Sequence, residues 1–130
     1  EYAYAKQNNL SWTQLQNKDG NFVQPSQDSF AAAAASADWN SVPGMGVILT
    51  DEVGENSWPV TSASFILLHK EQDKPANAKA VMNFFSWAFD EGADMAAELD
   101  YVPMPKEVTD QIKQNWAQQI KAKDGSAIWE

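Results

Sequence analysis

The sequence contains no arginine and no cysteine, and its single histidine is His69. Without cysteine the chain forms no disulfide, offers no thiolate nucleophile and provides no sulfur ligand for a metal. One histidine is too few for a multi-histidine metal site and leaves little material for a catalytic triad. These absences exclude several common kinds of enzyme and metal site.

Long hydrophobic runs and positive charge are also scarce. The longest strongly apolar run covers residues 65–68, far short of the ~20 residues of a membrane-spanning helix. Nine lysines face 18 acidic residues, which gives a net charge of −9. Because nucleic acids and anionic membranes attract clustered basic residues, this balance argues against both as partners.

The remaining composition is typical of one globular domain: 130 residues, 44% of them apolar and 21% charged. The first residue is Glu1 rather than methionine, and nothing near it resembles a signal peptide. Residues 2–5 alternate in the manner of a strand already under way. We therefore expect a processed or truncated N terminus.

Turn and capping signals organise the first half of the chain. The dipeptide Asp19-Gly20 predicts a hairpin between residues 11–15 and 21–23. An alanine-rich helix is expected over residues 26–37, with Ser26 as its N-cap. Residues 38–56 are rich in Gly, Asn, Asp and Ser, so they predict a loop with a short strand at residues 46–49.

Helices dominate the second half. The apolar run 65–68 predicts a short strand buried on both faces. A helix is expected from Pro75 to Gly92, a shorter one over residues 93–99, and a last one from Pro105. The last helix carries an apolar stripe at intervals of four residues, made by Val108, Ile112, Trp116 and Ile120. Strands mixed with helices predict an α/β layered architecture.

Few residues suggest catalysis or metal binding. His69 has no acid/base partner in its sequence surroundings, so we expect an exposed residue at a strand end. Asp90, Asp94 and Glu98 follow at intervals of four, and Asp90, Glu91 and Asp94 have the oxygen ligands that a hard cation prefers. The alternating acids and central glycine of a calcium loop are absent from the sequence, which favours a solvated helix face.

A hydroxyl cluster is the best candidate for a small-ligand contact. Gly44-Met45-Gly46 lacks the third glycine of a dinucleotide fingerprint, since Leu49 occupies that place. Thr61, Ser62 and Ser64 follow Trp58-Pro59, and short hydroxyls beside backbone amides bind oxyanions without formal charge. The alternative is that these hydroxyls form hydrogen bonds with neighbouring backbone groups.

The aromatic residues Phe84, Phe85, Trp87 and Phe89 are expected in the core.

Several unusual residues follow one another in a specific order. The most specific block comprises Gly54-Glu55, Trp58-Pro59, Thr61-Ser62, Phe65-Ile66-Leu67 and His69-Lys70. Further matches are residues 1–10, Phe30, Ala37-Asp38-Trp39, Phe84-Phe85, Trp87-Ala88, Leu99-Asp100-Tyr101 and Pro105. In this order and at these separations, the chain resembles the C-terminal part of the periplasmic phosphate-binding proteins (PstS type), the soluble receptors of ABC-type phosphate importers.

The resemblance implies an α/β fold, namely the C-terminal portion of a two-lobed type II periplasmic-binding-protein fold with a mixed sheet flanked by helices. Residues 1–56 would be the remainder of the second lobe. Residues 57–130 would supply the return strand and the closing helices of the first lobe. The expected location is the periplasm.

The resemblance also implies which residues are missing. The family binds phosphate through backbone amides, Ser and Thr hydroxyls, an aspartate and an arginine, in segments that a full-length chain carries before Glu1. None of these motifs matches a position here, so no phosphate-binding or catalytic residue, metal or cofactor is carried over. The lack of arginine in the composition is an independent sign of the same gap.

Three hypotheses follow. In the first hypothesis, the chain is part of a receptor that captures inorganic phosphate and delivers it to the membrane subunits of an ABC permease. The chain then catalyses no reaction, and this stretch lacks the residues with which the family binds phosphate. The second is a structural or interaction fragment, such as a proteolytic remnant, that covers its open sheet edges by self-association. In the third hypothesis, the chain is an enzyme such as a hydrolase, and the only supporting residues are His69 and scattered acidic residues.

Overall fold

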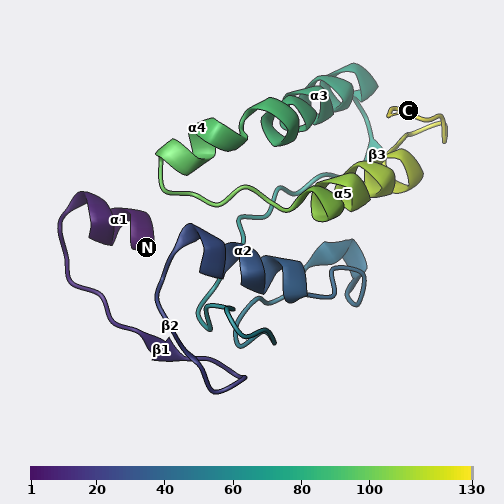
Figure 1. Ribbon diagram of the computed structural model, residues 1–130. Helices are drawn as coiled ribbons and strands as arrows, with labels where there is room; N and C mark the ends of the chain where they lie inside the picture. The colour runs from purple at the N-terminus through teal and green to yellow at the C-terminus, as the bar shows by residue number, and fades with distance from the viewer. Residues whose placement is uncertain (130) are drawn as a thin grey trace. The chain divides into compact units, whose positions relative to one another are not determined.

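A computed structural model describes residues 1–129 of the chain. The chain forms two compact units, one made of residues 1–65 and 94–105 and the other of residues 66–93 and 106–129. Each unit is therefore built from two separate stretches of sequence (Figure 1). In the described part of the chain, no helix has the length and apolar character needed to cross a membrane.

The first unit begins with a helix where the sequence predicted a strand. Helix α1 covers Tyr2–Gln7, and Ala3 is buried. The prediction for residues 2–5 was wrong because four alternating residues do not distinguish a strand from a short helix. Packing decides the matter: the Tyr2 ring lies edge-to-face against Trp12 and Phe30, each with ring centroids 5.5 Å away.

The predicted hairpin is confirmed. Strands β1 (Leu15–Gln16) and β2 (Phe22–Val23) pair antiparallel, and Leu15 lies opposite Val23. Gly20 has φ +86° in the turn, a conformation that glycine adopts without steric cost. The hairpin is therefore specified locally, by the Asp-Gly signal.

Helix α2 (Gln27–Ser36) is also confirmed. Ser26 and Ser29 form a reciprocal capping box, in which the Ser26 hydroxyl accepts from the Ser29 amide at 3.2 Å. In return, the Ser29 hydroxyl accepts from the Ser26 amide at 3.0 Å. Gln27 ties this helix to α4 (Ala93–Glu98) by donating to the Ala97 carbonyl at 2.9 Å.

The loop that follows α2 contains a 3-10 turn, η1 (Pro43–Met45), and no strand is assigned at residues 46–49. The expected strand there was therefore wrong, although Thr50 and Val60 form an isolated antiparallel bridge further on. The predicted buried strand at residues 65–68 is also absent from the described structure, and Leu67 is 91% exposed. No described strand lies beside this run, and an extended segment forms a strand only where a partner accepts its hydrogen bonds.

The second unit is built around helices α3 (Pro75–Glu91) and α5 (Lys106–Gln119), with strands β3 (Glu71–Gln72) and β4 (Lys121–Ala122) paired in parallel. Pro75 starts α3 and Gly92 ends it, as predicted. A Cβ on Gly92 would lie 2.5 Å from the Ala88 carbonyl oxygen, so only glycine fits there without a shift. The core of this unit consists of Ala78, Met82, Trp116, Ile120, Ala122 and Ile128.

The stripe predicted for the last helix is confirmed, since Val108, Trp116 and Ile120 are buried and Ile112 packs against the core. Phe85 and Phe89 pack against the same core. The expectation that Phe84 and Trp87 are core residues was wrong, because they are 58% and 49% exposed. Helices and short open sheets occur together, which confirms the predicted α/β class.

Candidate functional site

The candidate site is a pocket of about 350 Å³ in the first unit. Its walls come from the start of α1, from Phe30 and Ala34 of α2, and from residues 60–64 and 100–104. The three hydroxyl residues proposed from the sequence, Thr61, Ser62 and Ser64, all line this pocket. The structure therefore brings together the residues that sequence reasoning singled out.

The three hydroxyls differ in what they offer a ligand. Thr61 is 8% exposed, and its hydroxyl donates to the Trp58 carbonyl at 2.9 Å, which uses its one proton on the backbone. Ser62 and Ser64 are exposed, and neither hydroxyl has a hydrogen-bond partner among the described residues. The alternative interpretation, a hydroxyl that satisfies neighbouring backbone, thus holds for Thr61.

The charges in the pocket wall do not suit an anion. Asp100 and Glu1 are the ionisable side chains that line it, together with Tyr2 and Tyr101, and no lysine belongs to the described lining. Lys6 pairs with the Asp100 carboxylate, whose side chain is 11% exposed. That hydrogen bond and the attraction to the Asp100 carboxylate raise the pKa of Lys6. A phosphate in this pocket would therefore approach the carboxylates of Glu1 and Asp100, and Lys6, which pairs with Asp100, does not itself line the described wall.

Sequence reasoning missed the second wall of the pocket. Asp100 has φ +63° just after α4, and the Tyr101 amide donates to the Ala96 carbonyl at 2.9 Å. This turn sends residues 101–104 along the pocket. The signal was present in the sequence, because aspartate tolerates the left-handed conformation that ends many helices. What the sequence does not show is that this turn meets residues 60–64.

His69 is exposed, as predicted. Gln72 donates through Nε2 to the His69 carbonyl at 2.6 Å, and no described residue contacts its imidazole ring by a hydrogen bond or ion pair. General acid/base catalysis needs a group within hydrogen-bond reach of the proton that it moves, together with groups that orient it. The surroundings of His69 supply no such group among the described residues.

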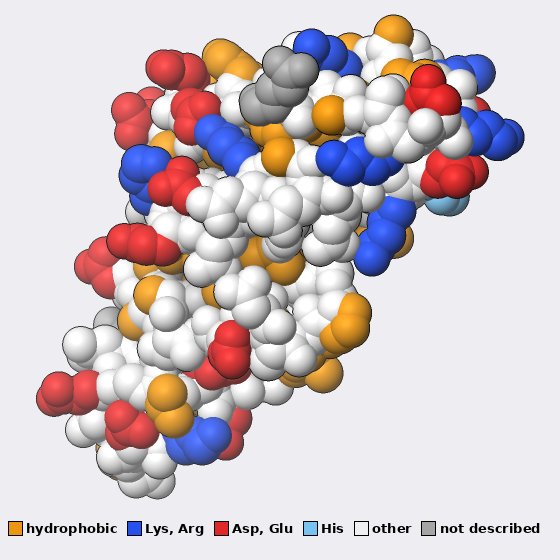
Figure 2. Space-filling view, turned by 90° about the vertical axis from the view of Figure 1, so that its right-hand side faces the viewer, with side chains coloured by type: hydrophobic (Ala, Val, Ile, Leu, Met, Phe, Trp, Pro, Cys, Tyr) orange, Lys and Arg blue, Asp and Glu red, His pale blue; other side chains and the backbone are white. Residues whose placement is uncertain are grey.

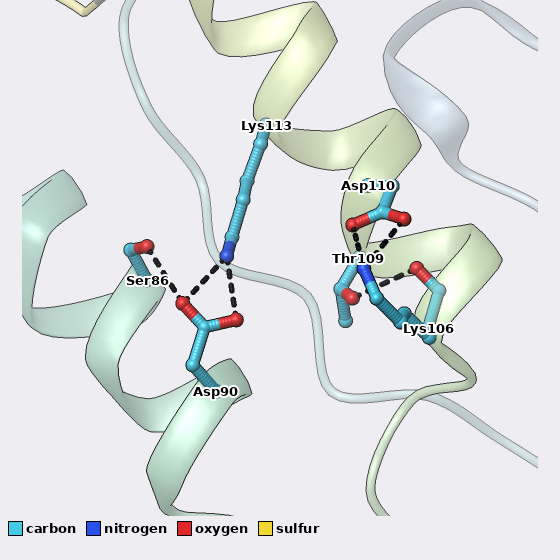
Figure 3. Close-up of polar contacts among 6 residues, drawn as sticks. All are labelled: Ser86, Asp90, Lys106, Thr109, Asp110 and Lys113. Atoms are coloured by element: carbon cyan, nitrogen blue, oxygen red, sulfur yellow. Dashed lines mark hydrogen bonds and ion pairs between the residues drawn. The ribbon is translucent and has the colours of Figure 1, made fainter.

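The acidic residues of α3 and α4 do not form a metal site among residues 1–129. Gly92 ends α3, so Asp90 lies on a different helix from Asp94 and Glu98. Asp90 instead accepts from Lys113 of α5, with Nζ 2.7 Å from both carboxylate oxygens, and from the Ser86 hydroxyl at 3.3 Å (Figure 3). The Lys113 hydrogen bond is the largest cause that lowers the pKa of Asp90.

A second ion pair on α5 joins Lys106 to Asp110, with Nζ 2.8 Å from both oxygens (Figure 3). This hydrogen bond is the largest cause that raises the pKa of Lys106. On the face drawn in Figure 2, lysine and acidic side chains lie interspersed, and the described residues form no broad basic patch there. These observations fit the predicted solvated helix faces.

The residues described so far define a mixed α/β chain with a hydroxyl-lined, acidic pocket in one of its two units. Over all 130 residues the chain is 60% identical to the phosphate-binding protein PstS of Pasteurella multocida, covering 38% of that protein. It is 59% identical over 121 residues to the phosphate-binding protein PstS of Haemophilus influenzae, covering 36% of it, and 46% identical over 121 residues to that of Xylella fastidiosa.

The resemblance to the phosphate-binding protein family is thus confirmed along the whole chain. The chain spans little more than a third of the length of the first two of these relatives. No family model matches the sequence.

Proposed function

We propose that this chain is part of a solute-binding receptor that captures inorganic phosphate and delivers it to the membrane subunits of an ABC-type permease. The observation that carries the proposal is 60% identity across all 130 residues to a protein named as phosphate-binding. We place the receptor in the periplasm and the chain in the C-terminal portion of a two-lobed fold, divided after residue 56. In this proposal the chain has no catalytic role.

The phosphate ligands belong, in this proposal, to the larger part of the receptor that lies outside the chain. Two observations support this. The sequence has no arginine, the side chain best suited to hold phosphate with two parallel hydrogen bonds. The pocket wall carries Asp100 and Glu1 but no lysine among its described residues. These two carboxylates repel an anion, so we assign this stretch of the receptor a structural role and not a role in binding phosphate.

A second candidate is a weak oxyanion site at Ser62 and Ser64. Both residues line the pocket with hydroxyls that have no partner among the described residues. Hydroxyl donors alone hold oxyanions only where the local dipoles are favourable. We treat this site as the competitor that the titration must separate from the first proposal.

The test is a calorimetric titration of the 130-residue chain with phosphate at neutral pH, with sulfate as the control anion. A parallel titration uses a chimera, the Pasteurella multocida protein with this chain in place of its matched region. We expect no heat from the isolated chain and saturable, phosphate-selective heat from the chimera.

Selective heat from the isolated chain that disappears in Ser62→Ala/Ser64→Ala, but persists in the exposed control Ser11→Ala, would establish the second candidate. A folded chimera that does not bind phosphate would overturn the first proposal.

A further inference from the structure

Residues 94–105 belong to the first unit but are separated in sequence from its other stretch, residues 1–65. They comprise most of helix α4 and the extended residues that follow it (Figure 1). None of these residues is buried, and Leu99 and Tyr101 are 61% and 54% exposed. No fully buried side chain therefore anchors this stretch, here termed the strap, to the rest of the unit.

Two side chains make polar contacts between the strap and the rest of the first unit. Gln27 donates through Nε2 to the Ala97 carbonyl at 2.9 Å. The ammonium group of Lys6 pairs with the Asp100 carboxylate. In the part of the chain that the structure describes, these are the hydrogen bonds and ion pairs that join the strap to residues 1–65.

The backbone hydrogen bonds of the strap close within the strap. The Tyr101 amide, for example, donates to the Ala96 carbonyl at 2.9 Å. Elsewhere in the first unit, a loop is tied to a helix through its backbone, since the Trp58 amide donates to the Ser29 carbonyl at 3.0 Å. Detaching the strap therefore breaks no described backbone hydrogen bond to residues 1–65, whereas detaching that loop does.

Both polar contacts are of a kind that opens easily. The side chain of Lys6 is 53% exposed, so water solvates its ammonium group when the pair with Asp100 separates. Ion pairs with such exposure contribute little to stability. Gln27 supplies one neutral hydrogen bond, whose loss changes an equilibrium by only about five-fold. The strap is thus held less firmly than α2, in which Ala33 is 0% exposed.

One side of the strap lines the pocket of the first unit. Residues 100–104 share this pocket with Ala34 and Leu49, which are 5% and 2% exposed. Lys6 and Gln27 do not belong to the described lining, although they hold the strap. A change at either residue can therefore alter how the strap is held without altering the pocket wall itself.

We propose that the strap opens as one piece while the rest of the first unit stays folded, and that Lys6 and Gln27 set how often it opens. Opening exposes Ala34 and Leu49, so these two contacts control access to the apolar floor of the pocket. The inference concerns a motion within the first unit, and it holds or fails independently of phosphate binding.

The absence of cysteine allows a direct test by site-specific labelling of the 130-residue chain. Ala34→Cys places a thiol in the pocket. Ala33→Cys, at a site 0% exposed and outside the described lining, is the matched control on the same helix. Each is combined with Lys6→Met, with Gln27→Ala and with both, and maleimide labelling is followed by peptide mass after circular dichroism has established folding.

We expect the thiol at position 34 to react about two- to five-fold faster in each single variant and about ten-fold faster in the double variant, because labelling a covered site requires local opening. The thiol at position 33 should react at an unchanged rate, since it becomes accessible only when α2 itself opens. Should Ala33→Cys not fold, hydrogen exchange of residues 28–36 reports the opening of α2 instead.

Lys18→Met is the control for charge, because Lys18 is an exposed lysine of the hairpin turn and its loss changes the net charge as Lys6→Met does. It should leave the rate at position 34 unchanged. An unchanged rate at position 34 in the double variant would overturn the inference. Equal acceleration at positions 33 and 34 would also overturn it, because the whole unit would then loosen, and so would equal effects of Lys18→Met and Lys6→Met.

Discussion

Replacing Asn17 by alanine tests the contact that orders the loop before the hydroxyl cluster. Asn17 is 5% exposed, and its Nδ2 group donates to the carbonyls of Gly54, Glu55 and Ser57 at 3.1, 2.9 and 3.3 Å. Its Oδ1 accepts from the Asn21 amide at 3.0 Å. One side chain thus joins the hairpin turn to residues 54–57, which lead into Trp58 and Thr61.

The expected cost follows from the burial of each partner. Ser57 is 0% exposed, so its carbonyl finds no water when Asn17 is removed, whereas the exposed Glu55 regains water readily. An unsatisfied buried acceptor costs about 1–3 kcal/mol, and each further net hydrogen bond is worth about 1 kcal/mol. We therefore expect Asn17→Ala to lower the free energy of unfolding by roughly 2–3 kcal/mol.

The assay is equilibrium unfolding in urea, followed by tryptophan fluorescence and circular dichroism. Asn8→Ala is the matched control, because Asn8 is exposed and donates only to the Tyr4 carbonyl at 2.9 Å. The control should change the free energy of unfolding by less than about 0.5 kcal/mol. An Asn17→Ala variant as stable as the control would refute the view that this side chain holds the loop in place.

Two further predictions concern the second unit. Met82 is 0% exposed in the core, so Met82→Ala should lower the free energy of unfolding in urea by about 2–5 kcal/mol. The control is Met95→Ala, at a site 48% exposed, which should lower it by less than about 0.5 kcal/mol. The hydrogen bond from Lys113 lowers the pKa of Asp90 below its ordinary value of 3.8. The ion pair therefore stabilises the folded state fully at pH values above 3.8. This stabilisation is lost as the pH falls through the lowered pKa that Asp90 has in the folded protein. In Lys113→Met the Asp90 carboxyl should titrate at a higher pH by NMR, and an unchanged midpoint would contradict the assignment.

The elements that sequence reasoning predicted correctly depend on signals within a few residues. Asp19-Gly20 predicts its hairpin because glycine adopts the positive φ of the turn. Ser26 caps α2, and Pro75 and Gly92 delimit α3 through their own backbone preferences. Such signals are independent of distant parts of the chain, so they are readable without a structure.

The errors depend on contacts between distant residues. The alternation at residues 2–5 suited a strand, but Tyr2 packs against Phe30 in α2 and Ala3 is buried as part of a helix. In the candidate site, the hydroxyls at positions 61, 62 and 64, predicted from the sequence to contact a small ligand, line the pocket, and their contact with a ligand stays a prediction. Asp100 lines the same pocket but belongs to the second stretch of the first unit, residues 94–105. Sequence reasoning missed it because the spacing of nearby residues does not show which distant residues come into contact.

The exposed apolar residues of the second unit have a single explanation if the chain is part of a longer receptor, as we propose. Leu67 is 91% exposed in a run whose composition suits a buried strand, and Phe84 is 58% exposed on a helix that already has a polar side. Large apolar residues are usually buried in folded proteins, and a contiguous group of exposed ones often marks a surface that packs against another part. In the proposed receptor, apolar residues that are exposed among the described residues are therefore where we expect the rest of the receptor to pack.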